Sequence, residues 1–331
     1  MDLSTTYLGL KLPHPIMPGA SPLVDSIDTV KRLEDAGAAA ITMHSLFEEQ
    51  ITREQDGMIY HMELTDGGSA EALAYFPKVD DFRLGPHQYL EQIRAIRQAV
   101  SIPVIASLNG TTAEGWLEYA KQIEQAGAHA LELNVYHVAA DPKETGSAVE
   151  NRVLDIVTAI KAQVKLPIAV KLSPFYSSVA NLAGRIDALG VEGLVVFNRF
   201  YQPDFDIKEL HVATSLTLST SQDLLLRLRW LAVLFGRVKA SLAVTGGVHT
   251  PEDALKAVMA GASGVQVVSS LLQKGPGHIK TLVNGMSAWL EEHEYTSLKQ
   301  AIGSLSLERS PNPAAYERAN YMRLLAAYKI A

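Results

Sequence analysis

The chain has 331 residues, of which 47% are hydrophobic and 20% charged, and its formal net charge is −7. This composition is typical of a folded globular protein, and the acidic balance argues against nucleic acid as a partner. The absence of cysteine excludes disulfides, cysteine-ligated zinc and iron–sulfur clusters held by this chain. The sequence has no secretory leader and no apolar run of about 20 residues, so we expect a cytoplasmic protein with no membrane partner and no metal.

The first part of the chain predicts a hairpin and two strands. Residues 5–20 alternate in hydropathy and lead into a strand at 15–21. A helix over 28–37 then precedes a strand at 39–43. The following stretch, 46–85, carries mixed charge and is too long for a simple connection. It is either a lid or binding loop, or a surface insertion.

From residue 89 onward, strands and helices alternate regularly. The strands are apolar runs without polar alternation, which is typical of a parallel sheet that is buried on both faces. Counting the two earlier strands, eight strands alternate with helices, so we predict an α/β fold, a (β/α)8 TIM barrel, as one domain over 1–331 with a second insertion at 199–221. A doubly wound open sheet is the alternative. The later strands are expected at 103–108, 130–134, 167–172, 193–198, 242–244 and 265–268, and the helices at 89–100, 112–126, 148–164, 179–189, 222–235, 250–260, 280–292, 296–302 and 313–329.

The last two predicted strands end in residues that suit an anion. Gly246 and Gly247 follow the strand at 242–244, and Ser269 and Ser270 follow the next strand. Each pair precedes a helix N-terminus, where backbone N–H groups and the helix dipole favour negative charge. Because the last two strands of such barrels commonly hold a phosphate, we predict a phosphate cradle here. The alternative is that the two glycines only form a turn.

Active sites of such barrels lie at the carboxyl ends of the strands. Lys171 ends one apolar strand, where burial of its charge is costly unless an electron-rich partner is present. It is a Schiff-base nucleophile, a cation beside the electron-rich end of a flavin, or a lysine that reaches solvent. Three strand-end asparagines offer donors and acceptors to a flat, amide-rich ligand. These asparagines are Asn109, Asn134 and Asn198. The other strand-end candidates are Ala20, Ser21, His44 and Ser45.

Together, these motifs resemble the FMN-dependent dihydroorotate dehydrogenase family, most closely its soluble branch. The resemblance rests on the order of Glu-Leu-Asn134, Val-Lys171-Leu-Ser-Pro, Asn198, Thr-Gly-Gly-Val at 245–248 and the Gly-Ala-Ser-Gly-Val-Gln-Val-Val-Ser-Ser segment at 261–270. It covers nearly the whole chain. It implies FMN as cofactor and a flavin-dependent dehydrogenase of pyrimidine biosynthesis that acts on a CH–CH donor. It also implies a small-molecule substrate, a homodimer, and a soluble electron acceptor or a separate redox subunit.

The resemblance also assigns roles to the strand-end residues. Lys171 would face the N1/O2 side of the flavin ring, where its charge stabilises the negative charge of the reduced ring. The phosphate and the ring would contact the remaining residues: Gly246, Gly247, Ser269 and Ser270 for the phosphate, Ala20, Ser21 and Ser45 for the ring, and Asn109, Asn134 and Asn198 for the ring or the substrate.

One loop departs from the family pattern. The family has Asn-x-Ser-Cys/Ser-Pro-Asn after the fourth strand, and its Cys or Ser takes a substrate proton as hydride leaves for flavin N5. Here residues 134–141 read Asn-Val-Tyr-His-Val-Ala-Ala-Asp, so His137 falls at the base position and Tyr136 just before it. We assign both as catalytic candidates with Lys171; the alternative for His137 is a packed or exposed loop histidine. His44 stands where the soluble branch has a lysine, and we expect a substrate other than dihydroorotate.

Two other functions remain open. A flavin-free barrel lyase or aldolase would use Lys171 as a Schiff-base lysine and the glycine cradle for a substrate phosphate. A non-catalytic flavoprotein would pass electrons to a partner, which the altered loop motivates.

Overall fold

A computed structural model describes residues 1–48, 50, 85–110, 114–199, 202–213, 217–316, 321–322 and 326–327. The expected insertion at 46–85 therefore lies outside the described residues except at its ends. Only the beginning and two short pieces of the expected helix at 313–329 are described. In the part of the chain that is described, no helix is both long and apolar enough to span a bilayer.

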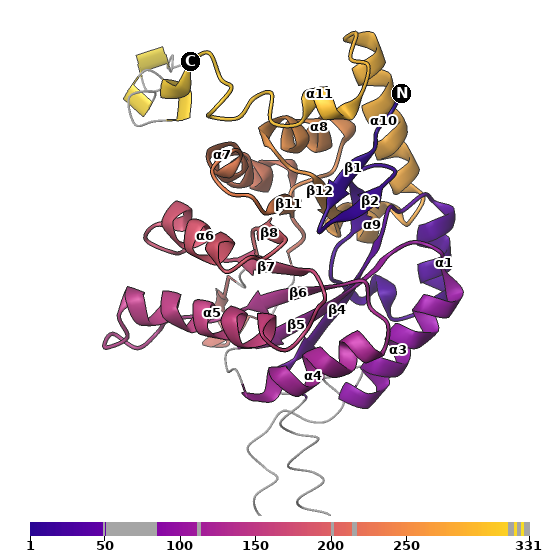
Figure 1. Ribbon diagram of the computed structural model, residues 1–331. Helices are drawn as coiled ribbons and strands as arrows, with labels where there is room; N and C mark the ends of the chain where they lie inside the picture. The colour runs from indigo at the N-terminus through magenta and orange to yellow at the C-terminus, as the bar shows by residue number, and fades with distance from the viewer. Residues whose placement is uncertain are drawn as a thin grey trace, which may run out of the picture.

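A parallel eight-stranded sheet forms the centre of the molecule (Figure 1). Its strands are β3 (Ile16–Pro18), β4 (Ile41–Phe47), β5 (Val104–Gly110), β6 (Ala130–Val135), β7 (Ile168–Leu172), β8 (Gly193–Val196), β11 (Ser241–Thr245) and β12 (Gly264–Val267). They are hydrogen-bonded in the order β3-β12-β11-β8-β7-β6-β5-β4. The end strands β3 and β4 also approach each other, and the Ala39 N–H donates to the Ile16 carbonyl at 3.0 Å. The sheet is thus nearly closed, which confirms the predicted TIM barrel and excludes the open sheet.

Helices lie around the outside of this barrel (Figure 1). They are α1 (Ile27–Asp35), α3 (Pro86–Ala99), α4 (Glu114–Gln125), α5 (Gly146–Lys161), α6 (Val179–Ala188), α7 (Leu224–Leu234), α8 (Pro251–Ala260), α9 (Ser269–Lys274), α10 (His278–Glu292) and α11 (Leu298–Ala301), with 3-10 turns η1 (Pro22–Val24), η4 (Ser221–Asp223) and η5 (Pro313–Tyr316). Apart from the stretch after Pro313, their ends differ from the predicted ones by only a few residues. At the start of α8, Thr250 Oγ1 accepts from the Asp253 N–H and the Asp253 carboxylate accepts from the Thr250 N–H, both at 3.2 Å, so this helix begins with a capping box.

The N-terminal hairpin closes one end of the barrel. Its strands β1 (Thr5–Tyr7) and β2 (Leu10–Leu12) pair antiparallel, and Tyr7 and Leu8 are fully buried in the barrel interior. A Cβ on Gly193 would lie 2.6 Å from Leu8, so this glycine leaves the space that the hairpin fills. The apolar packing leaves the opposite end, at the carboxyl ends of the strands, for polar side chains.

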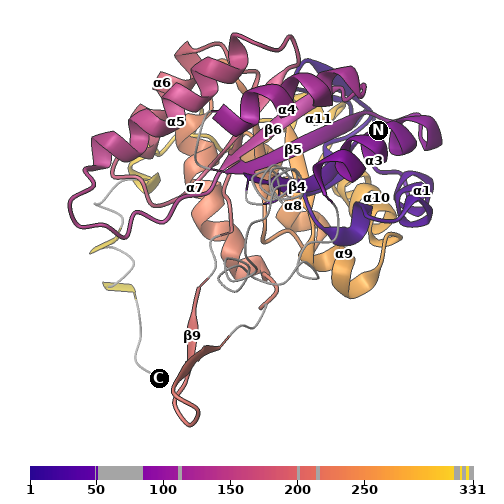
Figure 2. The same cartoon turned by 90° about the horizontal axis from the view of Figure 1, so that it is seen from below.

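The second insertion forms a β-hairpin. Its strands are β9 (Asp204–Asp206) and β10 (His211–Ala213), which pair antiparallel. Figure 2 shows this hairpin projecting away from the barrel. The hairpin explains why the sequence between β8 and α7 is longer than a connection in the barrel requires.

Candidate active site at the barrel mouth

A cavity of about 740 Å³ lies at the carboxyl ends of the barrel strands. This volume is within the range of sites that hold small molecules and cofactors. Most of the predicted site residues line it: Ala20, Ser21, Ser45, Asn109, Asn134, Tyr136, Lys171, Asn198, Gly246 and Ser269. Gly247, Ser270 and His137 do not line this cavity, although the first two lie directly beside residues that do.

The two-residue period of the strands explains why polar groups gather at this end. On β6, Ala130 belongs to the apolar barrel interior, and Glu132 and Asn134 follow on the same face. On β7, Ala169 belongs to the same interior, and Lys171 follows it. Each strand therefore contributes a small apolar residue to the closed end and polar residues to the mouth.

Lys171 is part of a buried polar chain. Its Nζ donates to Glu132 Oε1 at 2.8 Å, and both side chains are buried. Glu132 Oε2 accepts from Gln266 Nε2 at 2.5 Å. Because the ammonium is buried and paired, the alternative of a lysine that reaches solvent is wrong. The buried charge is instead compensated by a carboxylate that is itself hydrogen-bonded.

The strand-end asparagines are neighbours across the sheet. Asn109 is in register with Asn134, and Asn134 is in register with Lys171. Asn198 Nδ2 donates to Asn134 Oδ1. Together these side chains present amide groups and one ammonium at the same height of the barrel, as a flat ligand with several polar edges requires.

Ser45 belongs to a second hydrogen-bonded group at the mouth. Its Oγ lies 2.8 Å from Ser107 Oγ on the neighbouring strand. The Tyr89 hydroxyl donates to the Ser107 carbonyl at 3.0 Å and accepts from the Ser107 N–H at 2.9 Å. Burial raises the pKa of Tyr89 well above its ordinary value, so this hydroxyl stays neutral and fixes α3 against β5.

Ser21 contributes a buried hydroxyl to the cavity wall. Its Oγ is buried and has no hydrogen-bonding partner among the described residues, yet Ser21 lines the cavity. A buried polar atom without a partner is rare in folded proteins and costs free energy. A polar atom of a bound molecule in the cavity would remove that cost.

The predicted phosphate cradle has the backbone that it requires. Gly246 and Gly247 both have φ of +85°, a region that side chains disfavour. A Cβ on Gly247 would lie 2.4 Å from the Leu224 backbone nitrogen, and one on Gly246 would lie 3.0 Å from Arg227 Nη2. Glycine is therefore needed at both positions, which is more than a simple turn demands.

Hydroxyl groups join the two halves of this cradle. Ser219 Oγ accepts from the Gly247 N–H at 3.2 Å and donates to Ser269 Oγ at 2.9 Å. Ser270 Oγ donates to the Val248 carbonyl at 3.1 Å. Gly246 and Ser269 thus face the cavity, whereas Gly247 and Ser270 hold the β11 and β12 ends together.

Arg227 lies behind the cradle, and the sequence does not single it out. Its Nε donates to the Thr245 carbonyl at 2.5 Å and its Nη1 to the Asp223 carbonyl at 2.6 Å. Burial lowers the pKa of Arg227, but a guanidinium keeps its charge at neutral pH. No carboxylate forms an ion pair with it in the described part of the chain, so its charge favours an anion at the cradle.

His137, the predicted base, lies outside the cavity lining. Its Nε2 is 2.8 Å from Glu144 Oε2, and Glu144 also forms an ion pair with Arg152. The hydrogen bond from His137 and that from Arg152 hold the pKa of Glu144 below its ordinary value. The neighbouring Tyr136 does line the cavity. The structure therefore brings one of the two loop candidates to the site and commits the other to a hydrogen bond with Glu144.

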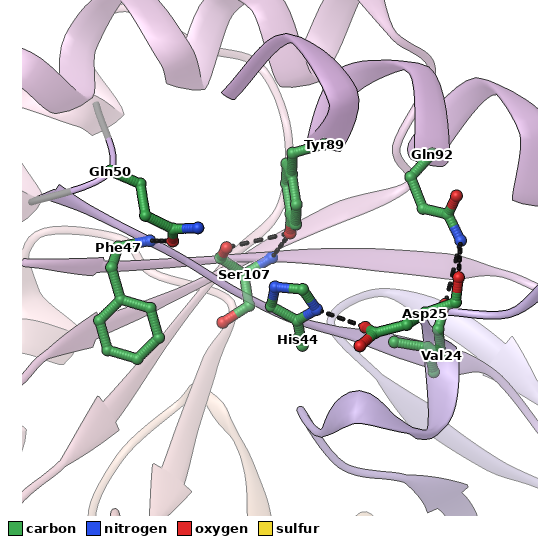
Figure 3. A network of polar contacts seen from close by, with 8 residues as sticks. All are labelled: Val24, Asp25, His44, Phe47, Gln50, Tyr89, Gln92 and Ser107. Carbon is green, nitrogen blue, oxygen red and sulfur yellow. Dashed lines mark hydrogen bonds and ion pairs between the residues drawn. The ribbon is translucent and has the colours of Figure 1, made fainter. Parts of the chain in front are cut away.

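His44 and Asp25 form a second histidine–carboxylate pair, which does line the cavity (Figure 3). His44 Nδ1 lies 2.7 Å from Asp25 Oδ1. The sequence marks His44 as a strand-end residue but gives no signal for Asp25, which follows the η1 turn. A lone aspartate ahead of a helix looks the same whether it faces solvent or a site.

The dihydroorotate dehydrogenase family model matches residues 2–290 of the chain. The chain belongs to the dihydroorotate dehydrogenase family. It is similar to the proteins called dihydroorotate dehydrogenase B (NAD(+)), catalytic subunit, from Thermoplasma acidophilum (25% identical, over 91% of this chain and 98% of the relative) and Thermoplasma volcanium (27%, 91% and 98%). The protein of the same name from Methanocaldococcus jannaschii is 26% identical over 91% of this chain and 97% of its own length. The predicted family is thereby confirmed.

Proposed function

We propose that this protein is an FMN-dependent oxidoreductase that transfers a hydride between a small CH–CH donor and the flavin. The observation that carries the proposal is the buried Ser21 Oγ, which has no partner among the described residues, in a cavity that also holds a glycine cradle and a buried lysine. Membership of the dihydroorotate dehydrogenase family supports an oxidoreductase that acts on such donors.

The residues present fit FMN. Its phosphate would be held by Gly246 and Ser269, braced by Gly247 and Ser270, with Arg227 behind. The positive charge of a guanidinium that pairs with no carboxylate among the described residues suits a dianionic phosphate better than a neutral group. This part of the proposal therefore depends on the chemistry of the cradle as well as on family membership.

The ring would lie between the two sets of polar strand ends. Asn109, Asn134 and Asn198 would bind ring or substrate, and Ala20, Ser21 and Ser45 would line the ring. Lys171 would place positive charge beside the edge where negative charge develops, and Glu132 would hold that ammonium in position. When bound, FMN would supply the acceptor for the hydride.

The substrate would enter on the side of Tyr136, and we propose that it differs from dihydroorotate because residues 134–141 depart from the family pattern. The relatives' names describe the catalytic subunit of an NAD(+)-type enzyme. This supports a separate redox subunit or a soluble acceptor for the electrons. A homodimer in the cytoplasm completes the proposal.

The Schiff-base lyase is disfavoured by the pairing of Lys171. Lys171 Nζ lies 2.8 Å from Glu132 Oε1 and both side chains are buried, so the amine would have to leave this salt bridge to attack a carbonyl. Reduction with borohydride in the presence of carbonyl substrates should therefore attach nothing to Lys171, and a trapped adduct would contradict our proposal.

The absorption spectrum of the purified protein tests the flavin. We expect flavin bands, and mass spectrometry of the released cofactor should give FMN. Protein that stays colourless after incubation with FMN would contradict the proposal. Anaerobic titration with L-dihydroorotate then tests the substrate: we expect the bands to persist, and bleaching would identify dihydroorotate as a donor.

A further inference from the structure

We propose that His44, oriented by Asp25, accepts the substrate proton in the dehydrogenation, the role that the sequence pattern gives to His137. This inference rests on the proposed function and names a residue for its proton transfer. The backbone of β4 brings His44 to the rim of the cavity.

β4 contains one residue more than its neighbour at this point. Thr42 is in register with Ile105, but Ser45 is in register with Ser107, so the register shifts between Thr42 and Ser45. Such a β-bulge redirects side chains and is frequent beside active sites. Because Ser45 contacts Ser107, the extra residue displaces His44 toward the turn that carries Asp25.

Three segments fix the imidazole (Figure 3). Asp25 Oδ1 lies 2.7 Å from His44 Nδ1. Gln92 Nε2 on α3 donates to the carbonyls of Val24 and Asp25, both at 3.1 Å, and so holds the turn in place. The Tyr89 ring meets the imidazole edge-on at a centroid distance of 6.0 Å. The side chain is thus held in one orientation before any substrate binds.

The contact with Asp25 determines which ring nitrogen can accept a proton. A carboxylate accepts from Nδ1–H, which leaves the lone pair on Nε2. Nε2 has no hydrogen-bonding partner among the described residues, and it is not one of the side-chain atoms there that are buried without a partner. In Figure 3 this nitrogen points away from Asp25, and His44 lines the cavity that Lys171 also lines.

The step balances with FMN as the oxidant. The C–H bond of one substrate carbon breaks, and its proton passes to His44 Nε2. The neighbouring carbon loses a hydride, with two electrons, to the flavin, and a C=C bond forms between the two carbons. The imidazolium beside the Asp25 carboxylate then returns its proton to solvent.

The His137–Glu144 pair has a similar contact distance but a different setting. His137 uses Nε2 for its contact, and Glu144 is shared with Arg152. This imidazole does not line the cavity, and its Nε2 already contacts Glu144. Removing the imidazole should therefore slow the reaction at His44 but not at His137.

The first test needs no substrate. In purified protein with ¹⁵N-labelled histidine, NMR should show neutral His44 with its proton on Nδ1, assigned by the signal that is lost in His44→Gln. Asp25→Asn should shift the proton toward Nε2, which a purely structural role of Asp25 would not do. A proton on Nε2 in the unsubstituted protein would overturn the proposal, because that nitrogen could not accept another.

The second test measures anaerobic flavin reduction by L-dihydroorotate and other saturated cyclic amides. With a donor that reacts, His44→Gln should slow reduction by about 10²- to 10⁴-fold, as expected for loss of a general base. His87→Asn, at an exposed ion pair on α3, is the matched control and should leave the rate unchanged. Equal loss in His137→Asn, or no loss in His44→Gln with FMN content and unfolding temperature unaltered, would overturn the proposal.

The two tests separate the possible failures. Unsubstituted protein that binds FMN but reacts with none of the donors would contradict the proposed function for those donors, while NMR still decides the state of His44. A reacting protein in which His44→Gln matches the unsubstituted rate would leave the oxidoreductase standing and refute only the role of His44.

Discussion

The two sides of the barrel mouth are built by different means. On the β11–β12 side, the backbone creates the site: Gly246 and Gly247 adopt positive φ, and little space surrounds them. On the β4–β7 side, buried or half-buried carboxylates and their partners create it, with Lys171 paired to Glu132 inside the barrel and His44 hydrogen-bonded to Asp25 at the rim. Adding an atom should therefore destabilise the first side, and removing a charge should destabilise the second.

The largest effect is expected when Lys171 is replaced by Met. This leaves Glu132, which is fully buried, without its cation and should lower the free energy of unfolding by about 3–5 kcal/mol. Urea denaturation measures the loss. If the carboxylate is the cause, adding Glu132→Gln to Lys171→Met should recover most of it.

Comparing the single variant with the double variant decides how the mouth is stabilised. A double variant as unstable as Lys171→Met would mean that the loss comes from the lysine's packing, and charge compensation would not distinguish the two sides. FMN binding should stay weak in both variants, because neither has the ammonium.

Gly247→Ala tests the other side. Its Cβ would meet the Leu224 backbone at 2.4 Å, and its φ of +85° adds strain of about 1–2 kcal/mol. Gly37→Ala is the matched control, because Gly37 has φ of +90° and no heavy atom within 4 Å of its Cβ position. The difference between the two variants, about 1–3 kcal/mol, measures the steric term alone.

FMN titration, followed by quenching of flavin fluorescence, should show weaker binding in Gly247→Ala and unchanged binding in Gly37→Ala. Equal stability and equal FMN affinity in the two variants would mean that the cradle tolerates an added atom. The contrast between a steric side and a charged side would then be wrong.

The sequence predicts the barrel well because its strands are apolar runs, and burial on both faces leaves few alternatives for such runs. The strand-end residues follow from the same topology. Glu132 could also be found, since it lies two residues before Asn134 and so shares its face. The single-domain organisation stays a prediction, as does any role of 46–85, most of which lies outside the described residues.

Other parts of the site depend on contacts that no local pattern contains. Arg227 and Arg229 occupy one helical segment, yet the first is buried behind the cradle and the second is exposed. His44 needs a one-residue bulge, which the apolar run does not reveal. His137 falls at the base position of the family's loop pattern, but its imidazole contacts Glu144, seven residues later, and does not line the cavity.

The smallest expected effect is the loss of folding stability in acid, and it comes from histidines that do not line the cavity. Burial lowers the pKa of His14, His129 and His278 below the ordinary value. In the unfolded chain they take up protons at about pH 6.5, before the folded protein does. Their contribution to stability is therefore complete above about pH 6.5, and it is lost as the pH falls through their lowered pKa values in the folded protein.

His129→Asn isolates one of these groups. His129 Nδ1 accepts from the Val104 N–H at 2.8 Å, and an asparagine oxygen can accept the same bond without titrating. We expect the urea midpoint of this variant to fall less between pH 7 and pH 5 than that of the unsubstituted protein, with equal midpoints above pH 7. If the urea midpoint of His129→Asn fell between pH 7 and pH 5 as far as that of the unsubstituted protein, this part of the acid sensitivity would belong to groups other than His129.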